Sequence, residues 1–387
     1  MATIKSIEAR KILDSRDKET IEVKVSLDDG MMAIDSVPSG TSTGSFESVA
    51  IEPNRAIQNI NQIIAPKLIG LDPREQRKID MLMIELDKTK DKSGLGANAI
   101  LGVSLAVSRA ASMSEKMPLY RYLNWLFQKE TGIQVKPSIP TPMMVMIEGG
   151  KHGSNPSVCI QEFLCITSVE NGGKIWKALK NILNSNKLDT HMGLEGGFVP
   201  KLEFDEDAIR FIMQAITQEK LTVPNEVKIG LDVAANNCQI SHDDILALLY
   251  RYPIFSLEDP IQENNWHEWA QLKLELDQRG KEYLLVGDDL FVTNHERLQK
   301  GVSELVANAI IIKLNQVGTV TETLEVVAMA MKAKYTHILS HRSGETMDTY
   351  ISDLAVATGA KYLKAGAPYA SERVIKYNRL REIEREL

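Results

Sequence analysis

Two patterns of hydrophobic and polar positions divide the chain into an N-terminal and a C-terminal part. Apolar and charged residues alternate along 21–25, as in a strand with one buried face, and the turn at 28–30 that follows predicts a hairpin. Residues 55–68 and 75–89 instead carry apolar residues at helical spacing, and the run 96–117 is apolar on most sides. The first part therefore predicts a sheet followed by helices, an α+β layer.

A proline-rich segment separates this part from the rest. The segment 134–142 contains three prolines, which disfavour both helix and central strand. We place the domain boundary there and expect one domain over 1–135 and a second over 136–387.

Beyond the boundary, short apolar runs alternate with amphipathic segments of helix length. The runs lie at 227–231, 254–257, 283–286, 309–312, 336–339 and 362–363. Repeated strand–helix units with continuous apolar strands predict a parallel sheet covered on both faces, and so many units in a row are best explained by a closed barrel. The expected fold class is α/β, a (β/α)8-type barrel with an N-terminal α+β capping domain.

A reactive side chain follows each apolar run. These side chains are Asp232, Glu258, Asp288, Lys313, His341 and Lys364. Because the carboxyl ends of barrel strands open on one mouth, residues far apart in the sequence become neighbours there. Three carboxylates gathered at one mouth repel one another, so a cation is needed between them. Oxygen ligands suit Mg²⁺, whereas the lack of nearby cysteines and the scatter of histidines argue against zinc.

Each of these residues taken alone has a plainer explanation. A single acid after a strand is often a helix N-cap, and a lysine such as Lys313 often pairs with an acid or lays its stem along apolar surface. A lysine base near neutrality needs its pKa lowered from about 10.4, which metal ions and Lys364 could achieve. Arg342 and Ser343 suit a phosphate, although a loop ion pair explains Arg342 as well.

Three further features could serve the same site. The small-residue loop 39–44 could fold over a ligand and offer the Ser39 hydroxyl, although most such loops are connectors. Glu162 and Glu195 stand beside glycines or a turn, where either could pass a proton to a leaving hydroxyl. Taken singly, an acid in such a place is more often a solvated or capping acid.

Composition narrows the possibilities mainly by exclusion. With 387 residues, 43% of them hydrophobic, the chain can bury two cores. A net charge of −7 without any Lys/Arg block argues against a dedicated nucleic-acid surface. No leader-like or membrane-length apolar segment occurs, so we expect no membrane binding and a cytoplasmic protein. Cys159, Cys165 and Cys238 form no C-x-x-C pair, and we expect three reduced thiols.

Taken together, the motifs resemble enolase (phosphopyruvate hydratase) from the first strand to the last helix. Matching stretches are ILDSR (12–16), VPSG (37–40), LGANAILGVS (95–104), GGKH (149–152), QEF (161–163), SLEDP (256–260), VGDDL (286–290), KLNQVGT (313–319), SHRSGET (340–346) and SER (371–373). The resemblance implies a TIM-like barrel enzyme that converts 2-phosphoglycerate to phosphoenolpyruvate and water in glycolysis and gluconeogenesis. It also implies two Mg²⁺ per active site.

The same resemblance implies a role for each matching residue. Asp232, Glu258 and Asp288 would hold the first Mg²⁺, and Ser39 would hold the second together with the substrate phosphate. Lys313 would take the C2 proton, and the metals and Lys364 would stabilise the enolate. Glu195, supported by Glu162, would help the C3 hydroxyl leave. The pocket would also be lined by His152, Gln161 and His341, with Arg342 and Ser343 on the phosphate.

Several positions depart from the family pattern. Leu194 stands where the family has an acid, Val145 and Glu148 replace two asparagines, and the usual Ser-Glu-Phe after Asp232 is here 236–238, Asn-Asn-Cys. These changes leave two alternatives open. One is a catalytically weakened enolase-fold protein that acts as a binding partner, and the other is an acid-sugar dehydratase on the same scaffold.

The resemblance also bears on assembly. Enolase dimers pair the region near Arg16 and Glu22 with charges of the C-terminal helix, where this chain has Glu382 and Arg385. We expect a homodimer or a higher homo-oligomer.

Overall fold

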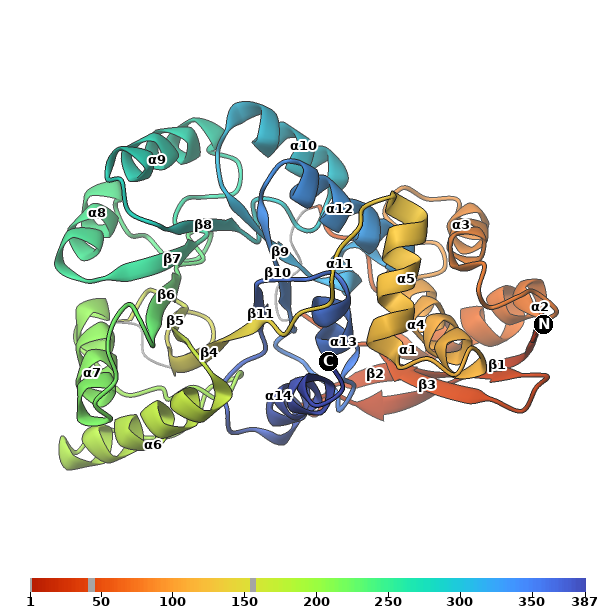
Figure 1. Cartoon of the computed structure of the whole chain (residues 1–387), viewed down its shortest axis with the longest axis horizontal. Coiled ribbons are helices and arrows are strands. Elements are labelled where there is room, and N and C mark those ends of the chain that lie inside the picture. Colours follow the sequence, from red (N-terminus) through yellow and green to blue (C-terminus); the bar gives the residue numbers. More distant parts are fainter. Residues whose placement is uncertain (1, 41–45, 154–157) are drawn as a thin grey trace.

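A small antiparallel sheet lies at one end of the molecule and a barrel at the other (Figure 1). The computed structural model describes residues 2–40, 46–153 and 158–387. The sheet consists of β1 (Ile4–Leu13), β2 (Glu19–Leu27) and β3 (Met32–Ser36) in that order. On β2, Ile21, Val23 and Val25 are fully buried and the residues between them are more exposed, as the alternating pattern predicted. Because β2 pairs with β3 in antiparallel fashion across the turn at 28–30, the predicted hairpin is confirmed.

Helices follow this sheet along the chain. They are α1 (Pro53–Asn59), the π-helix η1 (Ile60–Ile64), α2 (Ala65–Leu68), α3 (Gln76–Asp87), α4 (Ala97–Ser114) and α5 (Leu119–Thr131). Of these, α1, η1, α2 and α4 pack on the sheet, and α3 and α5 pack on α4. Most residues of α4 are buried, because the helix packs on β2 and β3. Gly102 allows this close approach, since a Cβ there would lie 2.7 Å from the Val23 side chain.

Eight strands close into the barrel, in the order β10-β11-β4-β5-β6-β7-β8-β9. Their bounds are β4 (Thr141–Glu148), β5 (Glu162–Ile166), β6 (Lys228–Asp232), β7 (Ile254–Glu258), β8 (Leu284–Gly287), β9 (Ala309–Ile312), β10 (Thr336–Ser340) and β11 (Tyr362–Lys364). All six apolar runs of the sequence form strands, so the predicted barrel is confirmed. The proposed domain boundary at residue 135 falls between α5 and β4.

Helices surround the barrel in Figure 1. They are α6 (Val169–Ser185), α7 (Asp205–Gln218), α8 (His242–Arg251), α9 (Trp266–Gln278), α10 (His295–Glu304), α11 (Leu314–Val317), α12 (Val320–Lys332), α13 (Tyr350–Ala357) and α14 (Ser371–Glu384). None of the described helices combines the length and the apolar character that crossing a bilayer requires.

We predicted a parallel sheet, and for one strand of the barrel this prediction is wrong. Strand β5 runs antiparallel to both β4 and β6, whereas the six predicted strands run parallel to one another. The described part of the link between β4 and β5 contains no helix, and a helix is the usual crossover between parallel strands. The reversal has a direct consequence for the site, because Glu162 at the start of β5 pairs with Glu148 and Asp232 at the ends of its neighbours.

The prediction of three reduced thiols is wrong for two of the cysteines. Cys159 and Cys238 form a disulfide with their Cα atoms 5.2 Å apart, and only Cys165 is free. The two bonded cysteines are 79 residues apart in the sequence. They meet because the segment before β5 lies beside the segment after β6, an arrangement that cysteine spacing alone cannot reveal.

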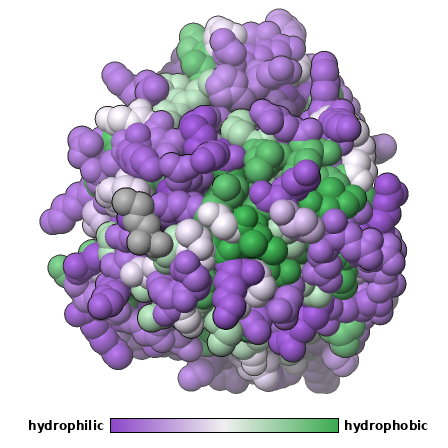
Figure 2. All heavy atoms as spheres, turned by 90° about the vertical axis from the view of Figure 1, so that its right-hand side faces the viewer, coloured by the Kyte–Doolittle hydropathy of each residue, from purple (hydrophilic) through white to green (hydrophobic). Residues whose placement is uncertain are grey.

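Figure 2 shows the face on the side of the N-terminal elements, which is largely hydrophilic with one apolar area. The exposed apolar side chains of these elements include Met32, Ile34, Ile63 and Ile69. Apolar area of this kind is common on monomers and also occurs at interfaces, so it does not by itself define an oligomer.

We predict that peptide mapping of the unreduced protein recovers two peptides joined through Cys159 and Cys238. An alkylating reagent should label Cys165 only after unfolding, because burial raises the pKa of its thiol and shields it. A Cys165→Ser variant is the matched control and should keep the joined peptides. Recovery of all three cysteines as alkylated thiols before any reductant is added would contradict the pairing.

Candidate active site

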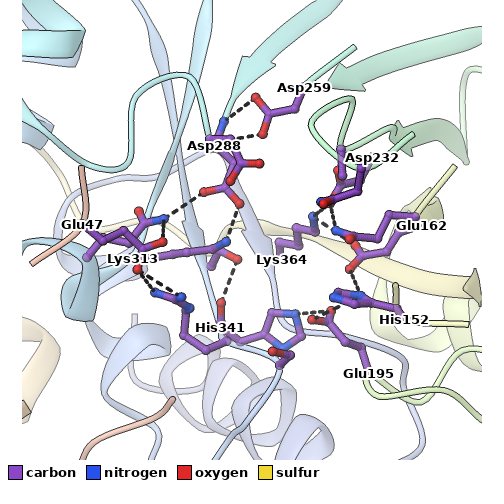
Figure 3. A pocket seen from close by; sticks show the side chains of 18 residues that line it. Glu47, His152, Glu162, Glu195, Asp232, Asp259, Asp288, Lys313, His341 and Lys364 are labelled. Atoms are coloured by element: carbon purple, nitrogen blue, oxygen red, sulfur yellow. Dashed lines mark hydrogen bonds and ion pairs between the residues drawn. The ribbon is translucent and has the colours of Figure 1, made fainter. Parts of the chain in front are cut away.

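The carboxyl ends of the barrel strands bring most of the predicted residues to one cavity (Figure 3). The predicted residues that line it are His152, Gln161, Glu162, Glu195, Asp232, Asp288, Lys313, His341, Arg342, Ser343 and Lys364. Two predicted metal ligands, Glu258 and Ser39, are not among the described residues of the lining. Glu258 lies just beneath it, in contact with Lys364.

Lys364 holds three carboxylates together at the centre of the mouth. Its Nζ lies 2.8 Å from Asp232 Oδ2, 2.9 Å from both Glu258 oxygens and 3.0 Å from Glu162 Oε2. The acids come from the adjacent strands β5, β6 and β7, and the lysine comes from β11. Burial lowers the pKa of Lys364, but these acids raise it more, so the net shift is well upward. Burial, followed by Asp232, raises the pKa of Glu258.

A second ion pair joins Lys313 and Asp288. Lys313 Nζ donates to Asp288 Oδ2, and Gln316 Nε2 donates to the other carboxylate oxygen at 3.2 Å. Burial lowers the pKa of Lys313, but the negative charges around it, chiefly that of Asp288 with Glu258 in addition, leave the net shift upward. The lowered pKa that a base needs is therefore not produced by this arrangement, because the carboxylate favours the charged ammonium.

Asp259 fixes the turn that carries Asp288. Its carboxylate accepts hydrogen bonds from the backbone N–H of Asp288 at 3.1 Å and of Asp289 at 2.7 Å. Asp259 itself has φ +40°, which is unusual outside glycine and is tolerated where surrounding contacts determine the backbone. Sequence reasoning assigned no role to Asp259, since its contacts are to a backbone segment that follows the next strand.

Glu195 faces two histidines on the other side of the cavity. His341 Nε2 lies 2.7 Å from Glu195 Oε2, while His152 Nδ1 lies 3.0 Å from Glu162 Oε1 and 3.9 Å from Glu195 Oε1. Burial raises the pKa of Glu195, but His341, His152 and Arg373 together bring it well below its usual value. Burial lowers the pKa of His152, yet the surrounding glutamates raise it to about 9.

Glu148 supports the turn that carries Glu195. It ends β4, is only 2% exposed, and accepts the backbone N–H of Gly197 at 2.7 Å and that of Glu195 at 3.1 Å. Burial, followed by the charge of Glu195, raises the pKa of Glu148 to about 8. The sequence singled out Glu148 only as a departure from the family pattern, and its partners could not be foreseen from that.

Arg342 is held at the edge of the cavity by two acceptors. Its Nη1 donates to Asn315 Oδ1 at 2.7 Å and to Glu47 Oε2 at 3.2 Å. The loop ion pair weighed as an alternative for Arg342 is thus present. It does not exclude a phosphate role, because the guanidinium offers five N–H donors.

Through its hydroxyl, Ser39 bonds to residues of the N-terminal part, and among the described residues it makes no hydrogen bond to the three carboxylates predicted to hold the first Mg²⁺. Its hydroxyl donates to Asp14 Oδ2 at 2.6 Å and accepts from Arg16 Nη2 at 2.7 Å, and its backbone pairs with Gly344. The rest of the predicted loop, 41–44, lies outside the described residues.

The donor set suits a hard divalent cation. Asp232, Glu258 and Asp288 are buried carboxylates, and each is now paired with a lysine ammonium that a cation would have to replace. Among the described residues, acids of Asp259, Asp288 and Asp289 approach within 4.8 Å of one another, as do ligand atoms of His152, Glu162 and Glu195. The carboxylates therefore could bind a metal after local rearrangement.

A closed barrel that gathers buried lysines, carboxylates and histidines at the mouth defines a barrel enzyme of acid–base chemistry. Comparison with known proteins shows to which family of barrel enzymes the chain belongs. Residues 4–123 match the family model for the N-terminal domain of enolase, and 136–248 and 237–387 match that for the C-terminal TIM barrel domain of enolase. The enolase of Acidothermus cellulolyticus is 44% identical over 420 aligned residues, which cover 100% of this chain and 95% of the relative. The chain belongs to the enolase family, as its motifs predicted.

We predict that Glu148→Gln makes folding stability less dependent on pH. Because the pKa of Glu148 rises from 4.5 to about 8 on folding, the native state binds more protons than the unfolded chain between these values. The stability due to protonated Glu148 is therefore fully present below the lower value and is lost as pH rises through the upper one. The variant keeps an acceptor oxygen but cannot ionise.

Thermal unfolding at about pH 5.5 and about pH 8.5 measures this difference. The melting temperature of the wild type should fall more steeply toward the higher pH than that of Glu148→Gln. The exposed Glu203→Gln variant is the matched control and should follow the wild type. The same pH slope in all three proteins would contradict the role of Glu148.

Proposed function

We propose that the chain is an active phosphopyruvate hydratase that converts 2-phosphoglycerate to phosphoenolpyruvate and water with the help of Mg²⁺. The observation that carries this proposal is the position of Lys313 and Glu195 on opposite sides of one cavity that also contains Asp232, Asp288 and Lys364. A base and a proton-transfer group on opposite sides suit an elimination, in which a proton and a hydroxyl leave neighbouring carbons.

In the proposed reaction, Lys313 Nζ takes the C2 proton of the substrate. Asp288 now raises the pKa of Lys313, so this step requires Asp288 to direct its charge elsewhere. Asp232, Glu258 and Asp288 are the residues that would hold Mg²⁺, which supplies positive charge for the enolate carboxylate. With Asp288 engaged in this way, Lys313 loses the partner that favours its ammonium form, and Lys364 close by opposes a second positive charge.

The departing C3 hydroxyl would be handled on the opposite side. Glu195, with His341 and His152 beside it, lies where a proton must be supplied for the hydroxyl to leave as water. Arg342 and Ser343 provide cationic and hydroxyl donors for the phosphate at the edge of the same cavity. One C–H bond and one C–O bond break, while the C=C bond, an N–H bond on Lys313 and an O–H bond of the released water form.

A phosphate-binding edge favours this substrate over an unphosphorylated sugar acid. The guanidinium of Arg342 donates to Glu47 and Asn315, and its five N–H donors suit a bidentate contact with a phosphate as well. A binding role without catalysis would leave the paired buried charges unexplained, because burying an ion pair often brings no net stability.

The homodimer that the resemblance implies stays a prediction. Within the chain, Glu22 pairs with Arg10 at 2.6 Å, Arg16 with Asp14 at 3.1 Å and Glu382 with Arg379 at 3.1 Å. Charges near the expected interface therefore already have partners, and contacts to a second copy would have to share or exchange them.

We predict that the wild type, mixed with 2-phosphoglycerate and Mg²⁺, forms phosphoenolpyruvate, detected by its ultraviolet absorbance. Lys313→Ala should lower kcat by at least about 10² to 10⁴-fold, because the base is lost. Lys201→Ala removes an exposed lysine instead and should leave kcat unchanged.

Chelation with EDTA tests the metal requirement of the same reaction. The signal should vanish with EDTA and return when Mg²⁺ is added in excess. No signal at high enzyme concentration, or equal rates for wild type and Lys313→Ala, would sink the proposal. Turnover of unphosphorylated sugar acids in its place would favour the dehydratase alternative.

A further inference from the structure

Arg373 is a completely buried cation that none of the roles above uses. It lies in the first turn of α14, with 0% of its surface exposed. Its Nη1 donates to His341 Nδ1 and to the carbonyl oxygen of Arg342, both at 2.7 Å. Its Nη2 donates to the carbonyl oxygens of Ser343 at 2.7 Å and of Leu194 at 3.0 Å.

These contacts determine which nitrogen of His341 carries the proton. A guanidinium has only donors and does not lose its proton in proteins, so the His341 atom that it touches must be an acceptor. Nδ1 of His341 is therefore unprotonated, and the single ring proton sits on Nε2. A doubly protonated imidazole would place an N–H against the guanidinium N–H.

The proton on Nε2 points at the residue proposed to act on the leaving hydroxyl. Nε2 lies 2.7 Å from Glu195 Oε2. The two side chains face each other in the close-up of the cavity (Figure 3). Since the imidazole supplies the proton of this contact, the Glu195 oxygen is the acceptor. Against burial, the contacts with His341, His152 and Arg373 hold the pKa of Glu195 well below its usual value, so its carboxylate is ionised. Arg373 also reaches Leu194, the residue before Glu195, so a single side chain fixes both members of the pair.

We propose that Arg373 is a positioning residue of the active site, which locks His341 as the neutral Nε2–H tautomer and aligns it with the Glu195 turn. The part that concerns the reaction rests on the proposed function, whereas the tautomer itself does not. His341 thus begins each turnover neutral and Glu195 ionised, so the proton for the leaving hydroxyl must come from another donor. Burial lowers the pKa of His152, but the surrounding glutamates raise it to about 9, and its protonated ring lies 3.9 Å from Glu195 Oε1, where it can supply that proton through Glu195.

The charges around His341 agree with a neutral ring. The charged groups that face it are Glu195, Arg373 and Glu345, and Glu345 is itself paired with Lys376 at 2.7 Å. Burial and the charge of Arg373 lower the pKa of His341, and the attraction of Glu195 raises it. The net result is a pKa of about 4. The ring therefore stays neutral across the pH range in which an ordinary histidine titrates.

A purely structural role for Arg373 is the competing explanation, because three of its four acceptors are backbone carbonyls. The two explanations differ in what they predict for the histidine ring. If Arg373 is only a structural brace, replacing it leaves the His341 tautomer unchanged. If Arg373 fixes the tautomer, replacing it changes the tautomer.

Nitrogen-15 NMR of histidine-labelled protein tests the tautomer without substrate. His341, assigned from the signal lost in His341→Gln, should show a protonated Nε2 and an unprotonated Nδ1 from about pH 6 to about pH 8. In Arg373→Met, which keeps the bulk and loses the donors, both tautomers should appear. A protonated Nδ1 or an imidazolium of His341 in the wild type would overturn the proposal whether or not Arg373→Met folds.

Kinetics of Arg373→Lys test the consequence for the reaction. We expect kcat to fall by about tenfold or more with little change in KM, and the pH profile of kcat to shift. Arg379→Lys is the matched control on the same helix, where Arg379 pairs with Asp353 at 2.8 Å away from His341. A pH profile and kcat equal to the wild type in Arg373→Lys would overturn the positioning role. An inactive wild type with the expected tautomer would count against the proposed function and still support the assignment of the ring.

Discussion

The ion cluster around Lys364 is the interaction on which the rest of the site depends. One buried ammonium neutralises carboxylates from three neighbouring strands, all within 3.0 Å of its Nζ. Removing one partner of a buried ion pair typically costs about 3 to 5 kcal/mol, because the other charge is left uncompensated. These buried acids therefore need a cation beside them. Closure of the barrel provides it, since it brings Lys364 of β11 into contact with the acids of β5, β6 and β7.

The reversed direction of β5 completes the same cluster. In a wholly parallel barrel, a residue at the start of a strand lies at the end remote from the mouth. Because β5 runs the other way, its first residue, Glu162, lies level with Glu148 and Asp232 at the mouth. The site therefore receives an acid from every strand between β4 and β8, and it needs cations from elsewhere to balance them. Lys313, Lys364, His152 and Arg373 provide that balance.

The sequence could predict those elements that a short stretch of residues encodes by itself. The strands from β6 to β11 were predictable because each is a short apolar run, and the reactive residue after each run follows from strand geometry. Strand β4 was not, because Pro142 within it and the two prolines just before it are typical of a linker. The antiparallel β5 was not, because no local feature of the sequence indicates the direction of a strand.

Contacts that depend on the closed fold were beyond sequence reasoning as well. The disulfide of Cys159 with Cys238 joins segments that only barrel closure brings together. Arg373 was visible as part of a motif, but its contact with His341 requires α14 to lie beneath the mouth. The upward shift of the Lys313 pKa also depends on Asp288. Asp288 follows β8 and Lys313 follows β9, and the two residues meet because these strands are adjacent in the barrel.

Calorimetric titration of the protein with Mg²⁺ tests the central claim most directly, namely that the acids at the strand ends form one cation site. Wild-type protein should bind Mg²⁺, and Glu258→Gln and Asp288→Asn should each weaken binding by about tenfold or more, because each removes a charged ligand. Glu304→Gln, on the outer helix α10, should bind as the wild type does. Equal affinity in the wild type and in both site variants would contradict the account.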